Sequence, residues 1–162
     1  MRPTNPHAVL IAHDRWANQQ LYAACDALSN DQFHHTFAMG TGSIHNNLIH
    51  NLGAMRRWTD VLNESEPHAR LEEKRHTLAE IRELHDAITA EFEHAALRRP
   101  FDTVIEPMQG ATAYTFTVGG ILAHVITHST HHRAQCLNML RQLGIEQHPM
   151  SSVMEWMLVA DA

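Results

Sequence analysis

The sequence predicts an all-α protein, a four-helix bundle that forms one domain over residues 1–162. Apolar residues recur every three or four positions through four long segments, and helix-start signals precede these segments. A hydrophobic content of 44% in 162 residues is enough for one core. No segment approaches the roughly 18 apolar residues of a membrane span, and the N-terminus lacks a signal peptide, so we expect a cytoplasmic protein that does not enter membranes.

The first predicted helix runs from about His7 to Leu28. Asn5 is a suitable N-cap, and Pro6 suits the first helical position because it lacks an amide hydrogen. Residues 29–32, Ser-Asn-Asp-Gln, match a capping box. We therefore expect a short extra turn after the first helix.

The second and third helices have clear starts. Ser43 can cap a helix from Ile44 to about Leu62. Thr77, followed three residues later by Glu80, matches another capping box and predicts a helix that reaches about Leu97.

Residues 98–116 are irregular and predict a short hairpin, since they contain two prolines and alternating apolar residues. The fourth helix is expected over residues 117–143, with Gly144 as a left-handed cap. Residues 151–160 predict a last short helix over the bundle. The connections before the third and fourth helices are long enough to cross a bundle of roughly 30 Å, so a simple up-down-up-down order is not forced.

A net charge of −6 gives no basic surface for a phosphate backbone, which argues against nucleic-acid binding. The unusual feature of the composition is its 15 histidines. The two cysteines, Cys25 and Cys136, are too few for a disulfide framework, and we expect both to be buried apolar groups. Trp16 and Trp58 are likewise expected in the core.

The fourth helix carries the strongest chemical signal. Its apolar positions, spaced three or four apart, form one seam: Val118, Ile121, Val125, His128, His132, Cys136, Met139 and Leu143. Residues four apart lie on one helix face with Cβ atoms about 5–6 Å apart, so His128 and His132 can reach one ion. Burial disfavours two adjacent charges, and neutral imidazoles bind zinc, nickel or iron well. The alternative is a hydrogen-bonded polar patch without a metal.

A third ligand has to come from another helix. On periodicity alone His50 of the second helix is slightly preferred over His13 of the first, and His45 and His85 are weaker alternatives.

Two further histidines flank the pair on the fourth helix. His124 lies one turn before His128 and is a candidate for a further ligand, a supporting group or neither. His131 is rotated about 100° from His132, so we expect it to face a neighbouring helix or solvent.

Three sequence blocks, in this order, resemble the signature blocks of the DinB family. They are residues 14–18, Asp-Arg-Trp-Ala-Asn; residues 42–50, which lead on to Trp58; and residues 124–135, His-Val-Ile-Thr-His-Ser-Thr-His-His-Arg-Ala-Gln. This resemblance implies His50, His128 and His132 as the metal ligands. It also implies a bundle in up-down-down-up order with long crossover connections.

The sequence departs from the family pattern at three positions. Ala134 replaces a glycine, Met55 stands where an aspartate is common, and His13 stands where a tyrosine is common. Ala134 is a mild change on a helix. The other two predict a changed substrate pocket or changed support for the metal.

Three histidines leave an open coordination position, which suits a catalytic ion. The resemblance extends to a wider group that includes YfiT-like proteins and transferases of bacillithiol, mycothiol or glutathione. Our leading hypothesis is therefore a metal-dependent thiol transferase that acts on a small molecule in stress or detoxification. A metal-dependent hydrolase is the second hypothesis, with Glu106 as a candidate general base. The third is a non-catalytic, metal-stabilised binding module, and in each case we expect a homodimer.

Overall fold

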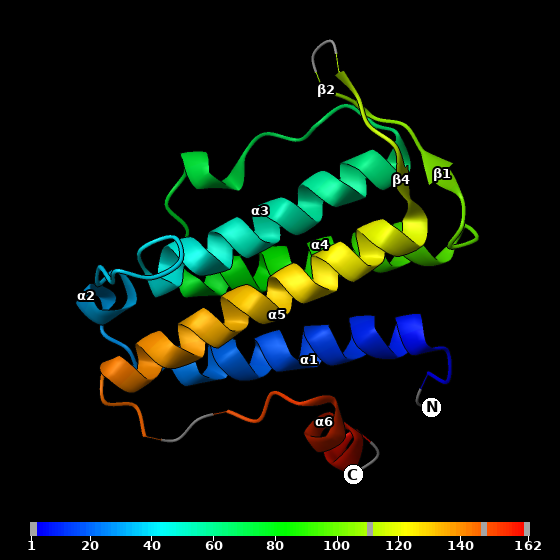
Figure 1. Ribbon diagram of the computed structural model, residues 1–162. Coiled ribbons are helices and arrows are strands. Elements are labelled where there is room, and N and C mark those ends of the chain that lie inside the picture. Colours follow the sequence, from blue (N-terminus) through cyan, green and yellow to red (C-terminus); the bar gives the residue numbers. More distant parts are fainter. Residues whose placement is uncertain (1–2, 110–111, 147–148, 161–162) are drawn as a thin grey trace.

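The computed structural model describes residues 3–109, 112–146 and 149–160. Four long helices lie side by side in it, and two short ones complete the six α-helices of these residues (Figure 1). The bounds are α1 Pro6–Cys25, α2 Asn30–Phe33, α3 Ile44–Asn63, α4 Leu78–Leu97, α5 Val118–Gln142 and α6 Val153–Val159. The prediction of a mainly helical protein is confirmed.

The helices begin where their capping residues predict. The side chain of Asn5 accepts a hydrogen bond from the amide of His7, and Pro6 is the first residue of α1. Ser43 caps α3, and Thr77 forms the predicted capping box of α4. Helix α1 ends three residues earlier than predicted, because Ser29 forms a second capping box and starts α2 in a new direction.

Figure 1 shows α1 and α5 running in one direction and α3 and α4 running in the other. The connection between α3 and α4 returns along the length of the molecule and contains a short 3₁₀ turn, η1 (Leu71–Glu73), that the sequence did not predict. The arrangement packs α3 against α5, and this contact brings His50 of α3 close to His128 and His132 of α5.

A core of apolar side chains fills the space between the long helices. From the predicted seam of α5, the buried apolar members are Val118, Ile121, Val125, Cys136 and Met139. Cys25 is also buried, and neither cysteine forms a disulfide, as predicted. The seam changes character at His128, which is only partly buried. The row of buried apolar side chains is therefore interrupted at the histidine pair, where His128 is partly accessible to solvent.

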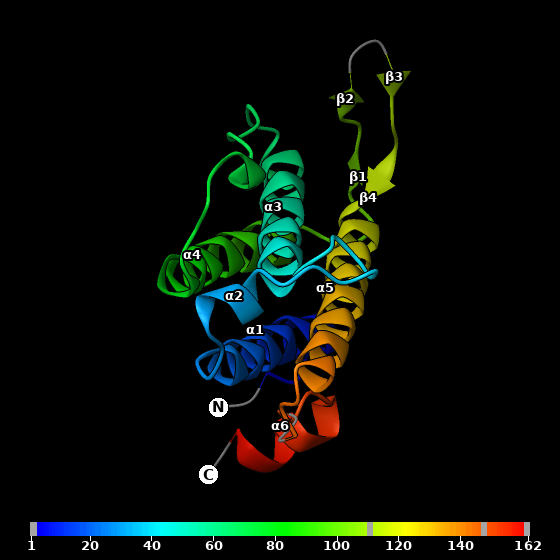
Figure 2. The ribbon, with the colours of Figure 1, turned by 90° about the vertical axis from the view of Figure 1, so that its left-hand side faces the viewer.

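Residues 104–109 and 112–117 contain the strands of the predicted hairpin. Strand β1 (Val104–Ile105) pairs antiparallel with β4 (Phe116–Thr117), and β2 (Met108–Gln109) pairs antiparallel with β3 (Thr112–Ala113). Figure 2 shows this hairpin as an arm that projects beyond the end of α5.

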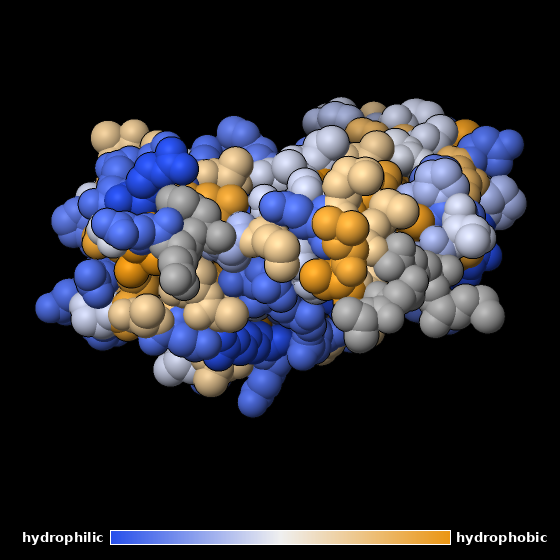
Figure 3. Space-filling view, turned by 90° about the horizontal axis from the view of Figure 1, so that it is seen from below, coloured by the Kyte–Doolittle hydropathy of each residue, from blue (hydrophilic) through white to orange (hydrophobic). Residues whose placement is uncertain are grey.

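Helix α6 lies against α1 and exposes apolar side chains on its outer face, which Figure 3 shows from below. Met154 is 69% exposed and Leu158 is 79% exposed. Trp156 is buried and anchors the helix. Within the described residues, no helix combines the length and apolar character that crossing a membrane requires.

Candidate metal centre

The structure brings His50, His128 and His132 together. The rings of His128 and His132 are one helical turn apart on α5, with centroids separated by 4.5 Å. His50 approaches from α3, with its ring centroid 5.2 Å from that of His128 and 4.8 Å from that of His132. One nitrogen from each imidazole lies within 4.8 Å of the others. The three residues could hold one metal ion.

The other candidates for a third ligand lie elsewhere. His13 is buried under the segment that leads to α6, where its Nε2 lies 2.9 Å from the carbonyl oxygen of Ser151. His45 is stacked on His34 beside α2, with centroids 4.7 Å apart. His85 is buried against Tyr22, between α1 and α4. Helical periodicity placed His13 on an inward face but could not say which neighbouring helix it meets.

His124 and His131 flank the three-histidine cluster without joining it. Both are exposed. The ring of His124 lies 5.6 Å from that of His128 and 5.2 Å from that of Trp58. His131 points away from the bundle and contacts Gln135, which agrees with the orientation expected from its position on the helix.

A hydrogen bond fixes the tautomer of His132. Its Nδ1 lies 2.8 Å from Oδ1 of Asn47, and the amide nitrogen of Asn47 donates to the carbonyl oxygen of Ser43. The amide oxygen can only accept, so Nδ1 of His132 carries the hydrogen. Nε2 keeps its lone pair and is free to bind an ion.

The site favours neutral imidazoles. Burial is the largest of the causes that together lower the pKa of His128 from 6.5 to about 4; His132 and His50 contribute because a second positive charge close by would be repelled. Burial also lowers the pKa of His132, with His50 as the next cause. Near neutral pH these two rings are therefore unprotonated, which is the form that binds a metal.

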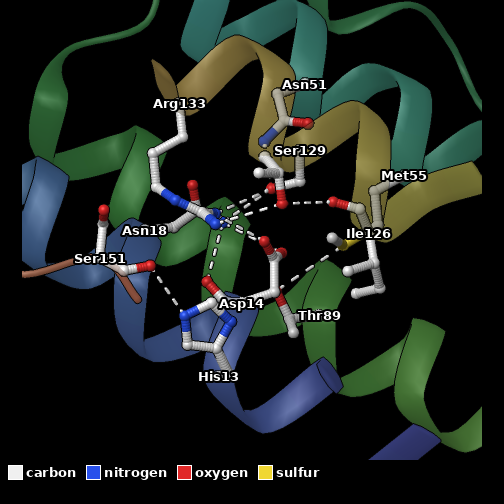
Figure 4. Close-up of polar contacts among 11 residues, drawn as sticks. His13, Asp14, Asn18, Asn51, Met55, Thr89, Ile126, Ser129, Arg133 and Ser151 are labelled. Atoms are coloured by element: carbon white, nitrogen blue, oxygen red, sulfur yellow. Dashed lines mark hydrogen bonds and ion pairs between the residues drawn. The ribbon is translucent and has the colours of Figure 1, made fainter. Parts of the chain in front are cut away.

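Ser129, between the two α5 ligands, connects three helices. Its hydroxyl oxygen accepts hydrogen bonds from Asn18 of α1 and Asn51 of α3, each at 3.1 Å (Figure 4). Ser129 is completely buried. Since Asn51 follows His50 and Ser129 follows His128, these contacts hold α3 and α5 in the register that brings the ligands together.

A buried ion pair lies next to this network. Nη1 of Arg133 is 2.7 Å from Oδ1 of Asp14, and both side chains are at most 3% exposed (Figure 4). Asn18 donates a second hydrogen bond to the Asp14 carboxylate. The paired charges connect α1 to α5 at the residue that follows His132.

Aromatic side chains lie next to His124, the neighbour of His128. Trp58, predicted to be a core residue, is only partly buried, and its ring lies 5.2 Å from those of both His124 and Phe116. Trp16 is also partly exposed. Because indole has a large apolar surface, Trp58 adds apolar surface beside His124.

One neighbour of the site was missed in the sequence. Oε1 of Glu72, in η1, lies 3.9 Å from Nδ1 of His50. No spacing rule connects residues 50 and 72, since the contact depends on how the long connection folds back. Glu106, the predicted candidate base, is exposed between β1 and β2, in the projecting arm.

The donor set suits a divalent metal ion. It consists of three imidazoles, a ligand type that zinc, nickel and iron accept. At least two of the rings are held neutral, one has its tautomer fixed, and the side chain of His50 is 40% exposed. Three neutral ligands and a partly open face leave room for a further ligand at the ion.

Comparison with known proteins agrees with this architecture. The DinB family profile matches residues 1–157. A crystal structure of the DinB-like protein YjoA from Bacillus subtilis superposes with a TM-score of 0.64, at 16% sequence identity, over 88% of this chain and 96% of that one. No curated protein matches the sequence. Since the family profile covers nearly the whole chain, this protein belongs to the DinB family.

Proposed function

We propose that the protein binds a divalent metal ion through His50, His128 and His132 and uses it to catalyse the transfer of a low-molecular-weight thiol to an electrophile. The observation that carries the proposal is the cluster itself, in which three imidazole nitrogens from two helices lie within 4.8 Å of one another. Such an ion, when bound, would stabilise the thiolate form of a thiol substrate.

The ligand set favours an anionic substrate group. The three imidazoles are neutral when they bind, so the ion keeps its full positive charge, whereas carboxylate or thiolate ligands would offset it. The partly exposed His50 leaves one side of the site open, as in catalytic centres with three protein ligands. A substrate thiolate fits both the charge and the open position.

The nucleophilic sulfur has to come from the substrate. Burial raises the pKa of Cys25 to about 12 and also raises the pKa of Cys136, so neither thiol ionises near neutral pH. In the proposed reaction the substrate thiol loses its proton to solvent, and its sulfur bonds to an electrophilic carbon. The leaving group departs with the electrons of the broken bond. Trp58 and His124 would form the wall along which an apolar electrophile lies.

Hydrolysis is less well supported by the local chemistry. It needs a general base beside the activated water. Oε1 of Glu72 lies 3.9 Å from Nδ1 of His50, and Glu72 is not part of the three-histidine cluster; Glu106 lies in the projecting arm. Among the described residues, no carboxylate belongs to the cluster.

The test uses tag-free protein loaded with cobalt(II), which reports on its ligands by absorption. Titration with glutathione or cysteine should produce a thiolate-to-cobalt charge-transfer band. The zinc-loaded protein should then accelerate conjugation of the same thiol to monochlorobimane. His128→Ala, which lacks one proposed ligand, should do neither. Binding of metal without a thiol band or conjugation would contradict the transferase proposal and leave only metal binding.

A further inference from the structure

The connection between α3 and α4 is held against α3. The amide and Nδ1 of His68 both contact the carboxylate of Asp60, at 3.0 and 2.6 Å. Leu71 is 5% exposed and belongs to the core. Nε2 of His76 lies 3.2 Å from the carbonyl oxygen of Leu71. These contacts fix the position of η1 beside α3.

Glu72 follows Leu71 and approaches one of the candidate ligands. Its Oε1 lies 3.9 Å from Nδ1 of His50, and the side chains of Glu72 and His50 are 46% and 40% exposed. The carboxylate is not part of the cluster of possible ligand atoms. It is therefore placed to act on His50 through Nδ1 without being a ligand itself.

Gly53 provides a second and independent observation. It lies in the interior of α3, one turn after His50, where glycine is less favourable than alanine. A Cβ at this position would lie 3.0 Å from Oε1 and 3.3 Å from Oε2 of Glu72. The absence of a side chain at residue 53 leaves the space that the carboxylate occupies.

We propose that Glu72 is a positioning residue for His50, and this inference rests on the proposed metal binding. With the ion bound, its carboxylate would accept the Nδ1 hydrogen of His50 once the 3.9 Å contact shortens to hydrogen-bond length, and this would direct Nε2 toward the ion and make the imidazole a stronger ligand. Asn47 acts on Nδ1 of His132 in the same way. Two of the three ligands would then be oriented from outside the cluster, His132 of α5 by the side-chain amide of Asn47 on α3 and His50 by the crossover connection.

The inference is tested by zinc affinity, measured by competition with a chromophoric chelator in tag-free protein. Loss of a group that supports a metal ligand typically weakens binding about 10- to 100-fold, and we expect Glu72→Ala to fall in this range. Glu72→Gln keeps an acceptor without the charge and should lose less affinity. Glu83→Gln removes a charge from an exposed position on α4 and should leave affinity unchanged.

Gly53→Ala separates positioning from stability. The added methyl group favours the helix, so the urea midpoint of the metal-free protein should rise or stay the same. The same methyl group pushes the Glu72 carboxylate away, so zinc affinity should fall several-fold. If Glu72 only stabilised the fold, Gly53→Ala would not raise the urea midpoint while lowering the zinc affinity.

Two results would overturn the positioning role while leaving the metal site intact. One is wild-type zinc affinity in Glu72→Ala. The other is a loss of metal-free stability in Glu72→Ala that accounts for all of its weaker binding. If the wild-type protein bound no zinc, nickel or iron, the proposed function itself would fail and this inference with it.

Discussion

Oδ1 of Asn47 accepts a hydrogen bond from Nδ1 of His132 at 2.8 Å, across the contact between α3 and α5. The same amide is anchored by its donation to Ser43, the N-cap of α3. Because Asn47 is held at the start of α3, its contact fixes the orientation of His132 on α5. Asn47 is not a proposed ligand, so a substitution at this residue can test metal binding while all three histidines remain.

Replacing Asn47 with leucine should weaken metal binding without removing a ligand. The variant leaves Nδ1 of His132 without its acceptor, so the ring no longer favours the binding tautomer, and affinity should fall about 10- to 100-fold. Zinc competition measures the loss. Asn138→Ala, an exposed change on α5, serves as the control and should bind like wild type.

Alanine substitution of each proposed ligand tests the composition of the site. His50→Ala, His128→Ala and His132→Ala should each lose most of the metal that copurifies with tag-free protein, because two imidazoles hold an ion weakly. Elemental analysis measures the content, and circular dichroism checks that the helices remain. His13→Ala and His131→Ala should keep their metal; loss of metal in His13→Ala alone would favour the alternative third ligand.

Gly40→Ala should disturb the site from the loop before α3. Gly40 has φ +54°, and an added Cβ would collide with Gln135 and lie 2.7 Å from Oδ1 of Asn47. We expect lower thermal stability and weaker zinc binding. Gly42→Ala is the matched control, since Gly42 has φ +95° and no atom within 4 Å of an added Cβ. It should lose stability through backbone strain alone and keep its zinc affinity.

Replacing only Arg133 of the buried Asp14–Arg133 pair should lower the free energy of unfolding strongly. Arg133→Met leaves a buried carboxylate without its partner, which typically costs roughly 3–5 kcal/mol. The double variant Asp14→Leu with Arg133→Met removes both charges and should recover most of that loss. Urea unfolding of the metal-free proteins gives the three free energies. Equal stability of the single and double variants would contradict this account.

The metal-free protein should lose stability in mild acid partly through His128. Its folded pKa is about 4, below the ordinary histidine value of 6.5, so the unfolded chain binds the proton more readily. Stability should therefore fall as the pH drops from about 6.5 toward 4, and His128→Asn should make this fall shallower. Urea midpoints across this range test the sign. His94→Asn, an exposed change on α4, should keep the wild-type slope.

The sequence by itself determined the features that depend on near neighbours in the chain. Ser29, Ser43 and Thr77 cap their helices through hydrogen bonds that span three residues, so short motifs predict them. His128 and His132 share a face because they are one turn apart on one helix. The three sequence blocks also indicated the family correctly.

Only the tertiary structure decided which distant residues meet that pair. Periodicity gave His50 and His13 nearly equal standing, because it shows that a side chain faces inward but not which helix it faces. The folded chain brings His50 to the cluster and turns His13 toward Ser151. It also places Glu72 behind His50 through a connection whose path depends on the burial of Leu71. Such contacts arise from the packing of whole helices, which no local spacing encodes.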